Sequence, residues 1–179
     1  MRLFTAIEIP EPLRESLSAI QDPDALQARW TDPEQFHVTL RFIGNVEEAQ
    51  APRYEKALAD VNAGPVQCDP YGLDVLPSRR SPRVLMLGLE RTDSLMALYD
   101  AVSDGLETEG LEAEDRAYRP HVTIGRLDEA DPDAVHDYLR LHEDRSFPNF
   151  KVDRVVLYES TLTPEGAIYE PQAMYPLDA

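Results

Sequence analysis

The spacing of apolar residues along the chain alternates between the two-residue period of strands and the longer period of helices. Apolar residues recur every three or four positions at Leu13, Leu17 and Ile20, which predicts a helix shortly after Pro10. Short aliphatic and β-branched runs bounded by Pro, Gly or Asn predict strands. We expect these strands at residues 2–9, 36–43, 66–76, 84–89, 120–127, 149–159 and 167–175.

Helix-period spacing recurs three more times, each time between two predicted strands. One helix is expected over about residues 47–62, a second begins at Thr92 or Asp93, and a third opens at Asp131-Pro132. Strands and helices therefore alternate along the chain, which predicts a mixed α+β fold. At 179 residues the chain suits one domain with a proper core.

The order of the predicted elements repeats itself. The segment Leu3–Leu13 can be aligned with Leu85–Leu95, strand on strand and helix on helix. The two halves, residues 1–77 and 78–179, therefore look like β-α-β-α-β duplicates. No Gly/Ser linker separates them, so we expect a single domain of two lobes that share one groove.

Two of the predicted strands carry the same short motif at matching places in the two halves. The first contains His37 and Thr39, the second contains His121 and Thr123, and an aliphatic residue follows each of these side chains. Because side chains alternate along a strand, each imidazole shares a face with its hydroxyl while the aliphatic residues point to the core. Two such strands facing each other would place two histidines and two threonines in one cleft.

This set of side chains suits acid–base catalysis at a phosphate ester. Imidazole titrates near about pH 6.5, so one ring can be neutral and the other protonated. The hydroxyls can donate to a non-bridging phosphate oxygen. No further ligands are spaced for a metal, and no Gly-x-Ser-x-Gly stretch predicts an acyl-transfer nucleophile. We therefore expect metal-free acid–base catalysis at a phosphate ester.

The charge of the chain is strongly acidic, with a formal net value of −17. The only lysines are Lys56 and Lys151, and scarce lysine beside abundant carboxylates is typical of halophilic proteins. This charge disfavours nonspecific nucleic-acid binding. The chain has no apolar stretch of membrane-spanning length and no signal-peptide core at its start, so we expect a cytoplasmic monomer without a membrane partner. The single cysteine, Cys68, excludes an internal disulfide and is expected to be inert.

The paired motifs resemble those of the two-histidine (2H) phosphoesterase superfamily, and within it the RNA 2′,3′-cyclic phosphodiesterase family, also called the 2′-5′ RNA ligase family. The resemblance rests on FHVTLRFIG at residues 36–44, RPHVTIGR at 119–126, RLFTAI at 2–7, VVLYES at 155–160 and Trp30. It implies a bilobal α+β duplication, with two antiparallel sheets flanking a V-shaped groove and helices outside. It also implies hydrolysis, without a cofactor, of RNA that ends in a 2′,3′-cyclic phosphate to a 2′-phosphomonoester.

The resemblance assigns roles to the matching positions. It implies that His37 is the proton donor to the leaving 3′ oxygen and that His121 is the proton acceptor from water. Thr39 and Thr123 would hold phosphate oxygens. The pseudo-symmetry allows either imidazole to approach either side, so the acid and base roles can also be exchanged.

Two arginines are candidate phosphate partners. Arg126 is suggested by the resemblance, but simple alternation places it on the face opposite His121, so it needs a bulge or the strand end at Gly125 to reach the groove. Arg41 shares the parity of His37. The basic run Arg79-Arg80 with Arg83 is either a phosphate-gathering loop or a solvated hairpin tip.

Aromatic residues that could stack a base are Phe4, Trp30 and Tyr118, and core packing is the expected role of the first two. His136 and His142 are expected on the surface. The main alternatives are hydrolysis of small cyclic nucleotides or ADP-ribose cyclic phosphate, and a binding module without turnover; both complete motifs argue against the last. Within the main interpretation, tRNA fragments are a candidate RNA partner, and 2′-5′ ligation is a further candidate activity.

Overall fold

The computed structural model describes residues 1–178 and confirms the predicted alternation of strands and helices. Short 3₁₀ turns at Pro33–Gln35 and Glu48–Gln50 precede β3 and α2. The helices are α1 (Glu11–Ile20), α2 (Ala51–Ala59), α3 (Asp93–Thr108) and α4 (Pro132–Leu141). The strands are β1 (Arg2–Glu8), β2 (Arg29–Trp30), β3 (His37–Asn45), β4 (Val66–Cys68), β5 (Pro70–Pro77), β6 (Pro82–Leu89), β7 (His121–Arg126), β8 (Phe150–Val152), β9 (Arg154–Thr163) and β10 (Gly166–Pro176).

The two histidine strands lie side by side at the centre of the main sheet. The strand order is β10-β9-β1-β3-β7-β6-β5, with β2 paired to β7, and neighbouring strands are antiparallel. Within the described range, β3 and β7 share a single ladder pair, Val38–Val122. The two expected antiparallel sheets are therefore joined into one at this pair. We call β10, β9, β1 and β3 lobe one, and β7, β6, β5 and β2 lobe two.

The lobes do not follow the two sequence halves expected to divide near residue 77. Strand β5 pairs with β6 in lobe two, and β9 pairs with β1 in lobe one. The reason is the short connection at residues 78–81, because antiparallel strands joined by so few residues form a hairpin. Each lobe is completed by two strands from the other half of the chain, β9 and β10 in lobe one and β2 and β5 in lobe two.

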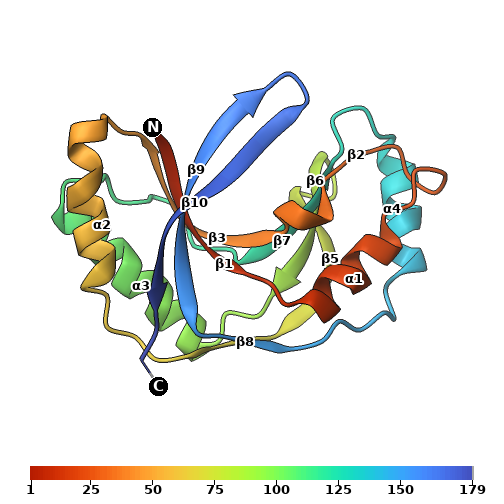
Figure 1. Cartoon of the computed structure of the whole chain (residues 1–179). Coiled ribbons are helices and arrows are strands. Elements are labelled where there is room, and N and C mark those ends of the chain that lie inside the picture. The colour runs from red at the N-terminus through yellow and green to blue at the C-terminus, as the bar shows by residue number, and fades with distance from the viewer. Residues whose placement is uncertain (179) are drawn as a thin grey trace.

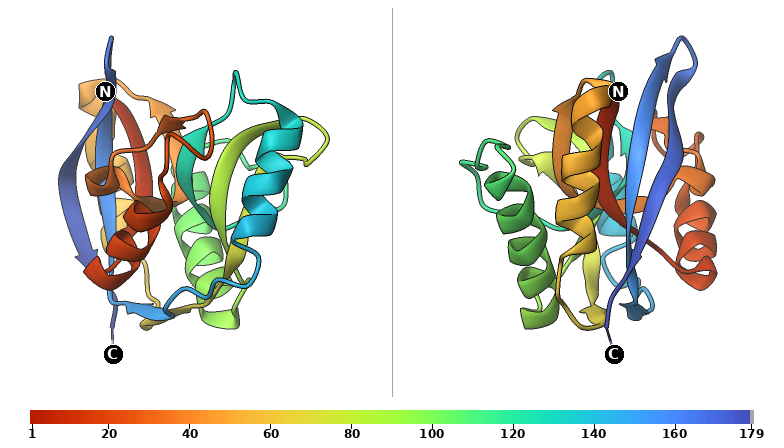
Figure 2. Two further views of the ribbon diagram at one scale, coloured as in Figure 1. Left: turned by 90° about the vertical axis from the view of Figure 1, so that its right-hand side faces the viewer. Right: turned by 60° about the vertical axis from the view of Figure 1, so that its left-hand side comes forward.

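The helices are exchanged in the same way. Helices α1 and α4 lie in the same half of Figure 1, where the Tyr138 hydroxyl of α4 donates to the Ile20 carbonyl at 2.5 Å. Helices α2 and α3 lie side by side in the other half, as the right view of Figure 2 also shows. Each helix buries one apolar face, as Leu13, Leu17 and Ile20 of α1 illustrate. The helices thus cover one face of the sheet and leave the opposite face, which carries the motif side chains, free of helices; we call this the groove face. None of the helices within residues 1–178 is long and apolar enough to cross a bilayer.

A β-bulge in β3 reverses the alternation of side chains after Thr39. The pairing with β1 skips Leu40, so that Thr5 lies opposite Arg41. The Thr5 hydroxyl accepts a hydrogen bond from the Arg41 amide at 3.0 Å and donates to its carbonyl at 3.2 Å. As a result Arg41 is buried on the helix side of the sheet, whereas Phe42 is 58% exposed.

The same irregularity occurs at the equivalent place in β7. The pairing with β6 skips Ile124, because Met86 lies opposite Thr123 and Leu85 lies opposite Gly125. The alternation is again reversed, and Arg126 is exposed. The bulge therefore returns Arg126 to the face that carries His121 and Thr123.

Candidate active site

His37 is held by a main-chain carbonyl at the beginning of β3. Its Nδ1 lies 2.8 Å from the Gln35 carbonyl oxygen and its Nε2 lies 3.0 Å from Oγ1 of Thr39. Because a carbonyl oxygen can only accept, Nδ1 carries the proton and donates it. In the neutral ring Nε2 is consequently the acceptor, and it can take the hydrogen bond of the Thr39 hydroxyl.

His121 is held in the same way at the beginning of β7. Its Nδ1 donates to the Arg119 carbonyl at 2.7 Å, again two residues upstream. No residue of the described chain forms a hydrogen bond with its Nε2. The tautomer is therefore the same in both motifs, and the Nε2 atom of His121 is available to a solvent molecule or a ligand.

The four motif side chains meet diagonally across the junction of the lobes. Val38 pairs with Val122 in antiparallel orientation, so His37 lies toward Thr123 and Thr39 lies toward His121. All four are half-buried, while the two valines between them are fully buried. The structure thus brings together the four motif residues that the sequence predicted, with one imidazole and one hydroxyl from each lobe.

Burial lowers the pKa of both imidazoles. For His37 the desolvation outweighs the Gln35 hydrogen bond, which raises the pKa, and the nearby His121 lowers it further. For His121 the desolvation likewise outweighs the raising effect of the Arg119 carbonyl, and the Arg119 charge lowers the pKa as well. Burial therefore favours the neutral form of both rings in the free protein, and an anion between them would favour protonation.

Aromatic rings surround His37 on lobe one. The ring centroid of Phe4 lies 5.2 Å from that of His37, Tyr169 meets His37 edge-on at 5.2 Å, and Tyr158 lies at 6.5 Å. Tyr158 also stacks on Phe4 at 5.3 Å. Tyr158 and Tyr169 were not predicted from the sequence, because their place on the groove face follows from alternation within β9 and β10 only once the pairing of β9 with β1 is known.

A further tyrosine lies beside His121 on lobe two. Gly88 pairs with His121, and a side chain at Gly88 would collide with the Tyr71 ring. The Tyr71 ring therefore covers Gly88 next to His121. Tyr71 itself is 50% exposed. Nothing in the local sequence predicted this placement, because it depends on the register between β5 and β6.

Arg126 lies at one end of the groove face of β7. Together with Gln27, Ala28, Arg29, Asp128 and Glu129 it lines a cavity of about 400 Å³. Arg29 in that cavity is 3.5 Å from Asp128, an exposed pair that leaves both side chains free to move. None of the four motif side chains lines this cavity, so Arg126 shares the face of Thr123 but lies beyond it along β7.

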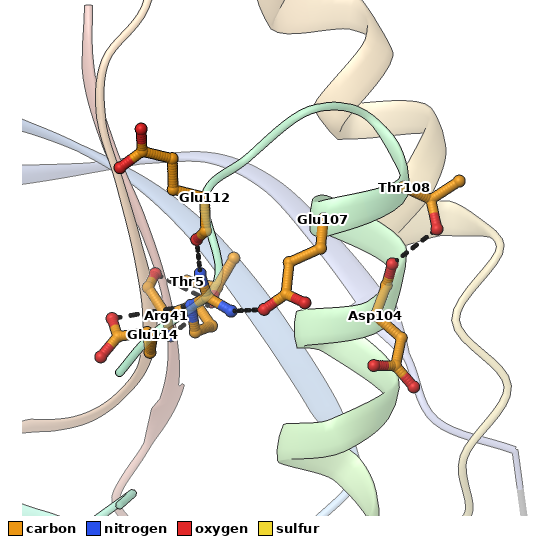
Figure 3. A network of polar contacts seen from close by, with 7 residues as sticks. All are labelled: Thr5, Arg41, Asp104, Glu107, Thr108, Glu112 and Glu114. Carbon is orange, nitrogen blue, oxygen red and sulfur yellow. Dashed lines mark hydrogen bonds and ion pairs between the residues drawn. The ribbon is translucent and has the colours of Figure 1, made fainter. Parts of the chain in front are cut away.

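Arg41, in contrast, does not point into the groove, and its expected role as a phosphate partner is wrong. The bulge at Leu40 turns its side chain to the helix side, where it is 2% exposed. There the guanidinium contacts Glu107 at 2.6 Å, the Glu112 carbonyl at 2.8 Å and Glu114 at 3.6 Å (Figure 3).

The other sequence candidates lie outside the groove or in the core. Trp30 packs on Tyr138 with ring centroids 6.1 Å apart, and Tyr118 is largely buried against Tyr99. Phe4 is buried among the rings around His37. Phe4 therefore offers no open stacking surface, and Trp30 and Tyr118 are each half-buried against a neighbouring tyrosine.

The basic run and the remaining histidines meet near α4. Arg79 pairs with Asp74 at 3.3 Å, and its carbonyl accepts a hydrogen bond from Nε2 of the half-buried His136 at 2.7 Å. His142 packs against Tyr138 with ring centroids 4.6 Å apart.

Two other sequence features involve sulfur and metal chemistry. Cys68 is fully buried, and burial raises the pKa of its thiol to about 12. Among residues 1–178 no three His, Cys, Asp or Glu side chains are grouped as a metal site.

The motifs and the fold have counterparts in known proteins. The family model of the 2′-5′ RNA ligase superfamily matches residues 9–163. The chain is 35% identical over 177 residues to the RNA 2′,3′-cyclic phosphodiesterase of Thermotoga maritima, with 95% of this chain and 92% of the relative covered. It is 31% identical over 172 residues to the protein of the same name from Archaeoglobus fulgidus, with 95% and 97% covered. Its fold matches the crystal structure of TT0787 of Thermus thermophilus with a TM-score of 0.82 at 23% identity, over 99% of this chain and 98% of that one.

Proposed function

Because this chain belongs to the 2′-5′ RNA ligase superfamily, we propose that it hydrolyses RNA 2′,3′-cyclic phosphate ends to 2′-phosphomonoesters. One observation carries the mechanism: both imidazoles are held through Nδ1 by a main-chain carbonyl, so the Nε2 atom of each is left to act at the junction of the lobes. Two such rings can act on opposite sides of one phosphorus atom. The names of the relatives supply the substrate class, and the geometry supplies the acid–base pair.

In the proposed reaction His121 is the base and His37 is the acid. Nε2 of His121 takes a proton from a water molecule whose oxygen attacks phosphorus, and the bond between phosphorus and the 3′ oxygen breaks. Protonated His37 gives its Nε2 proton to the leaving 3′ oxygen, so that one water is added and a 2′-phosphate with a free 3′ hydroxyl results. The unpartnered Nε2 of His121 supports its role as the group that meets water.

The threonines and Arg126 would hold the phosphate. Thr39 and Thr123 come from opposite lobes, so each hydroxyl can donate to a different non-bridging oxygen as negative charge develops. Arg126 lies further along β7 and can pair with the same phosphate or with the next one in the RNA chain. The negative charge of the bound diester also raises the pKa of both imidazoles, which favours the protonated state that the acid requires.

The proposed function is tested with an RNA oligonucleotide that ends in a 2′,3′-cyclic phosphate, in EDTA and at both high and low salt. We expect hydrolysis under chelation and a product that resists a 3′-specific phosphatase. Loss of activity in EDTA that one divalent ion restores would contradict the metal-free mechanism. An exclusively 3′-phosphate product would mean that the acid and base roles, or the docking, are reversed.

RNA is favoured over small cyclic nucleotides because the groove extends beyond the two histidines. Exposed Phe42 and Tyr71 and the exposed Arg126 offer contacts that a mononucleotide would not fill. We therefore expect a higher kcat/KM for an oligonucleotide, such as a tRNA fragment, than for a free 2′,3′-cyclic nucleotide or ADP-ribose cyclic phosphate. Equal values would favour the small-molecule alternative.

A further inference from the structure

Very little of the sheet fixes the distance between the two catalytic histidines. In the part of the chain that the structure describes, β3 and β7 share the single ladder pair Val38–Val122, whereas β1 and β3 are paired along the whole of β1. Acid–base catalysis across a junction is sensitive to displacements of about 1 Å. Other contacts must therefore hold β7 against β3.

One such set of contacts is centred on Arg41. Its Nη1 donates to the Glu107 carboxylate at the end of α3, and its Nη2 donates to the Glu112 carbonyl in the loop that leads to β7 (Figure 3). Glu114 approaches Nε at 3.6 Å. A buried guanidinium with several partners is a fixed link, so Arg41 ties the loop before the second motif to the strand of the first.

A second contact lies closer to the histidines. The Tyr118 hydroxyl donates to the main-chain carbonyl of Thr39 at 2.7 Å. The Tyr118 ring stacks on Tyr99 of α3, with centroids 4.1 Å apart and planes 10° from parallel. Burial raises the pKa of the phenol, so the hydroxyl keeps its proton and remains a donor. Tyr118 thus joins α3 and the loop to the backbone of a substrate-binding threonine.

Tyr118 immediately precedes the residue that orients His121. The Arg119 carbonyl accepts the Nδ1 proton of His121 at 2.7 Å. A displacement of Tyr118 would therefore move that carbonyl and tilt the imidazole. Gln35, the counterpart of Arg119 in the first motif, is held differently. Its side-chain amide donates to the main-chain carbonyl of Ala167 in the β9–β10 hairpin at 2.6 Å.

We infer that Tyr118 is a positioning residue, whose hydroxyl sets His121 relative to His37 and Thr39 across the lobe junction. The predicted effect of Tyr118 on turnover rests on the proposed function. The predicted effect of Tyr118 on the orientation of the His121 ring does not depend on that function. Tyr118 does not touch the substrate itself. Its role differs from the base-stacking role that its aromatic character first suggested.

The test is Tyr118→Phe, which keeps the stack on Tyr99 and removes only the hydrogen bond. With a 2′,3′-cyclic-phosphate oligonucleotide we expect kcat to fall roughly ten-fold or more, with KM changed less than about two-fold. The melting temperature should fall by no more than about 4 °C, the usual value of one hydrogen bond in a chain of this size. The matched control is Tyr99→Phe, because the Tyr99 hydroxyl makes no hydrogen bond within residues 1–178, and it should retain wild-type kcat.

A second readout uses the free protein with ¹⁵N-labelled histidine. In Tyr118→Phe the ring resonances of His121 should shift or broaden, while those of His37 keep their wild-type positions. Unchanged His121 resonances together with unchanged kcat would overturn the inference. So would a large fall in melting temperature with changes at both histidines, which would indicate a general structural role. If the wild type does not hydrolyse the cyclic phosphate, the proposed function fails, but the resonances still decide the role of Tyr118.

Discussion

At the scale of single residues, the orientation of each imidazole depends on a neutral carbonyl rather than on a carboxylate. The Gln35 and Arg119 carbonyls fix the Nδ1 tautomer of His37 and His121. A carboxylate in their place would raise the imidazole pKa strongly, because it would favour the cation. With a carbonyl, burial remains the larger effect and the pKa of each ring is lowered. Each ring can therefore lose its proton readily, which suits a residue that must change its protonation state in every turnover.

Replacing either histidine with alanine should remove the acid or the base. We expect His37→Ala and His121→Ala each to lower kcat by roughly 10²–10⁴-fold, because a positioned acid or base contributes that much. The double variant should be little worse than either single variant, since the two rings act as a pair. His136→Ala is the control, because His136 lies on α4 outside both motifs, and its one hydrogen bond within residues 1–178 is to the Arg79 carbonyl. Near wild-type turnover of either motif variant in the same assay would remove that histidine from the mechanism.

The direction of the pKa shifts predicts an acidic optimum for kcat/KM. As pH rises through the lowered pKa of the acid, its proton is lost and the rate falls; as pH falls, the base is protonated and the rate falls again. Because burial lowers the pKa of both His37 and His121, the maximum should lie below about pH 6.5. The two limbs report macroscopic values of the coupled pair. The profile of kcat should be displaced to higher pH, since the bound diester favours protonation, and a rate that rises to an alkaline plateau would contradict the pair.

At the scale of elements, the two bulges decide which arginine faces the groove. Simple alternation along each strand assigns Arg41 to the face of His37 and Arg126 to the face opposite His121, and the skipped Leu40 and Ile124 reverse both assignments. Neither bulged residue is a glycine or another residue type that would reveal the irregularity. The motif threonines precede the bulges, so alternation places them correctly. It misplaces Arg41, and for Arg126 it reaches the observed face only through the bulge that the resemblance required.

The contacts of buried Arg41 predict that its two acidic partners, Glu107 and Glu114, contribute unequally to the free energy of unfolding. Glu107→Ala would leave the buried guanidinium without its 2.6 Å partner and should lower the free energy of unfolding by about 2–3 kcal/mol, less than for a fully buried pair because Glu107 is 32% exposed. Glu114 lies at 3.6 Å and is 39% exposed, so Glu114→Ala should cost less than about 1 kcal/mol. Denaturant unfolding followed by circular dichroism measures both. Equal decreases in the free energy of unfolding for the two variants would mean that distance and burial do not determine the relative strength of these contacts.

At the scale of the whole molecule, the exchange of strands between the halves was beyond the reach of the sequence. The helices and strands follow from local periodicity and capping, as at the Thr92 cap of α3, whose hydroxyl accepts from the Leu95 amide. The duplicate halves offer equivalent apolar faces, however, so periodicity cannot tell which half receives β5 or β9. Tyr71, Tyr158 and Tyr169 depend on that choice, and for this reason the aromatic side chains beside the histidines were not predicted.

The exchange also sets the order in which a newly made chain becomes complete. Strand β1 is synthesised long before its partner β9, since Leu3 pairs with Glu159. Contacts so distant in sequence form late and slowly. Both histidine motifs are therefore synthesised well before β9 and β10 bring Tyr158 and Tyr169 to His37. We expect a nascent chain that already carries both motifs to remain inactive toward the RNA around it until the β9–β10 hairpin has left the ribosome.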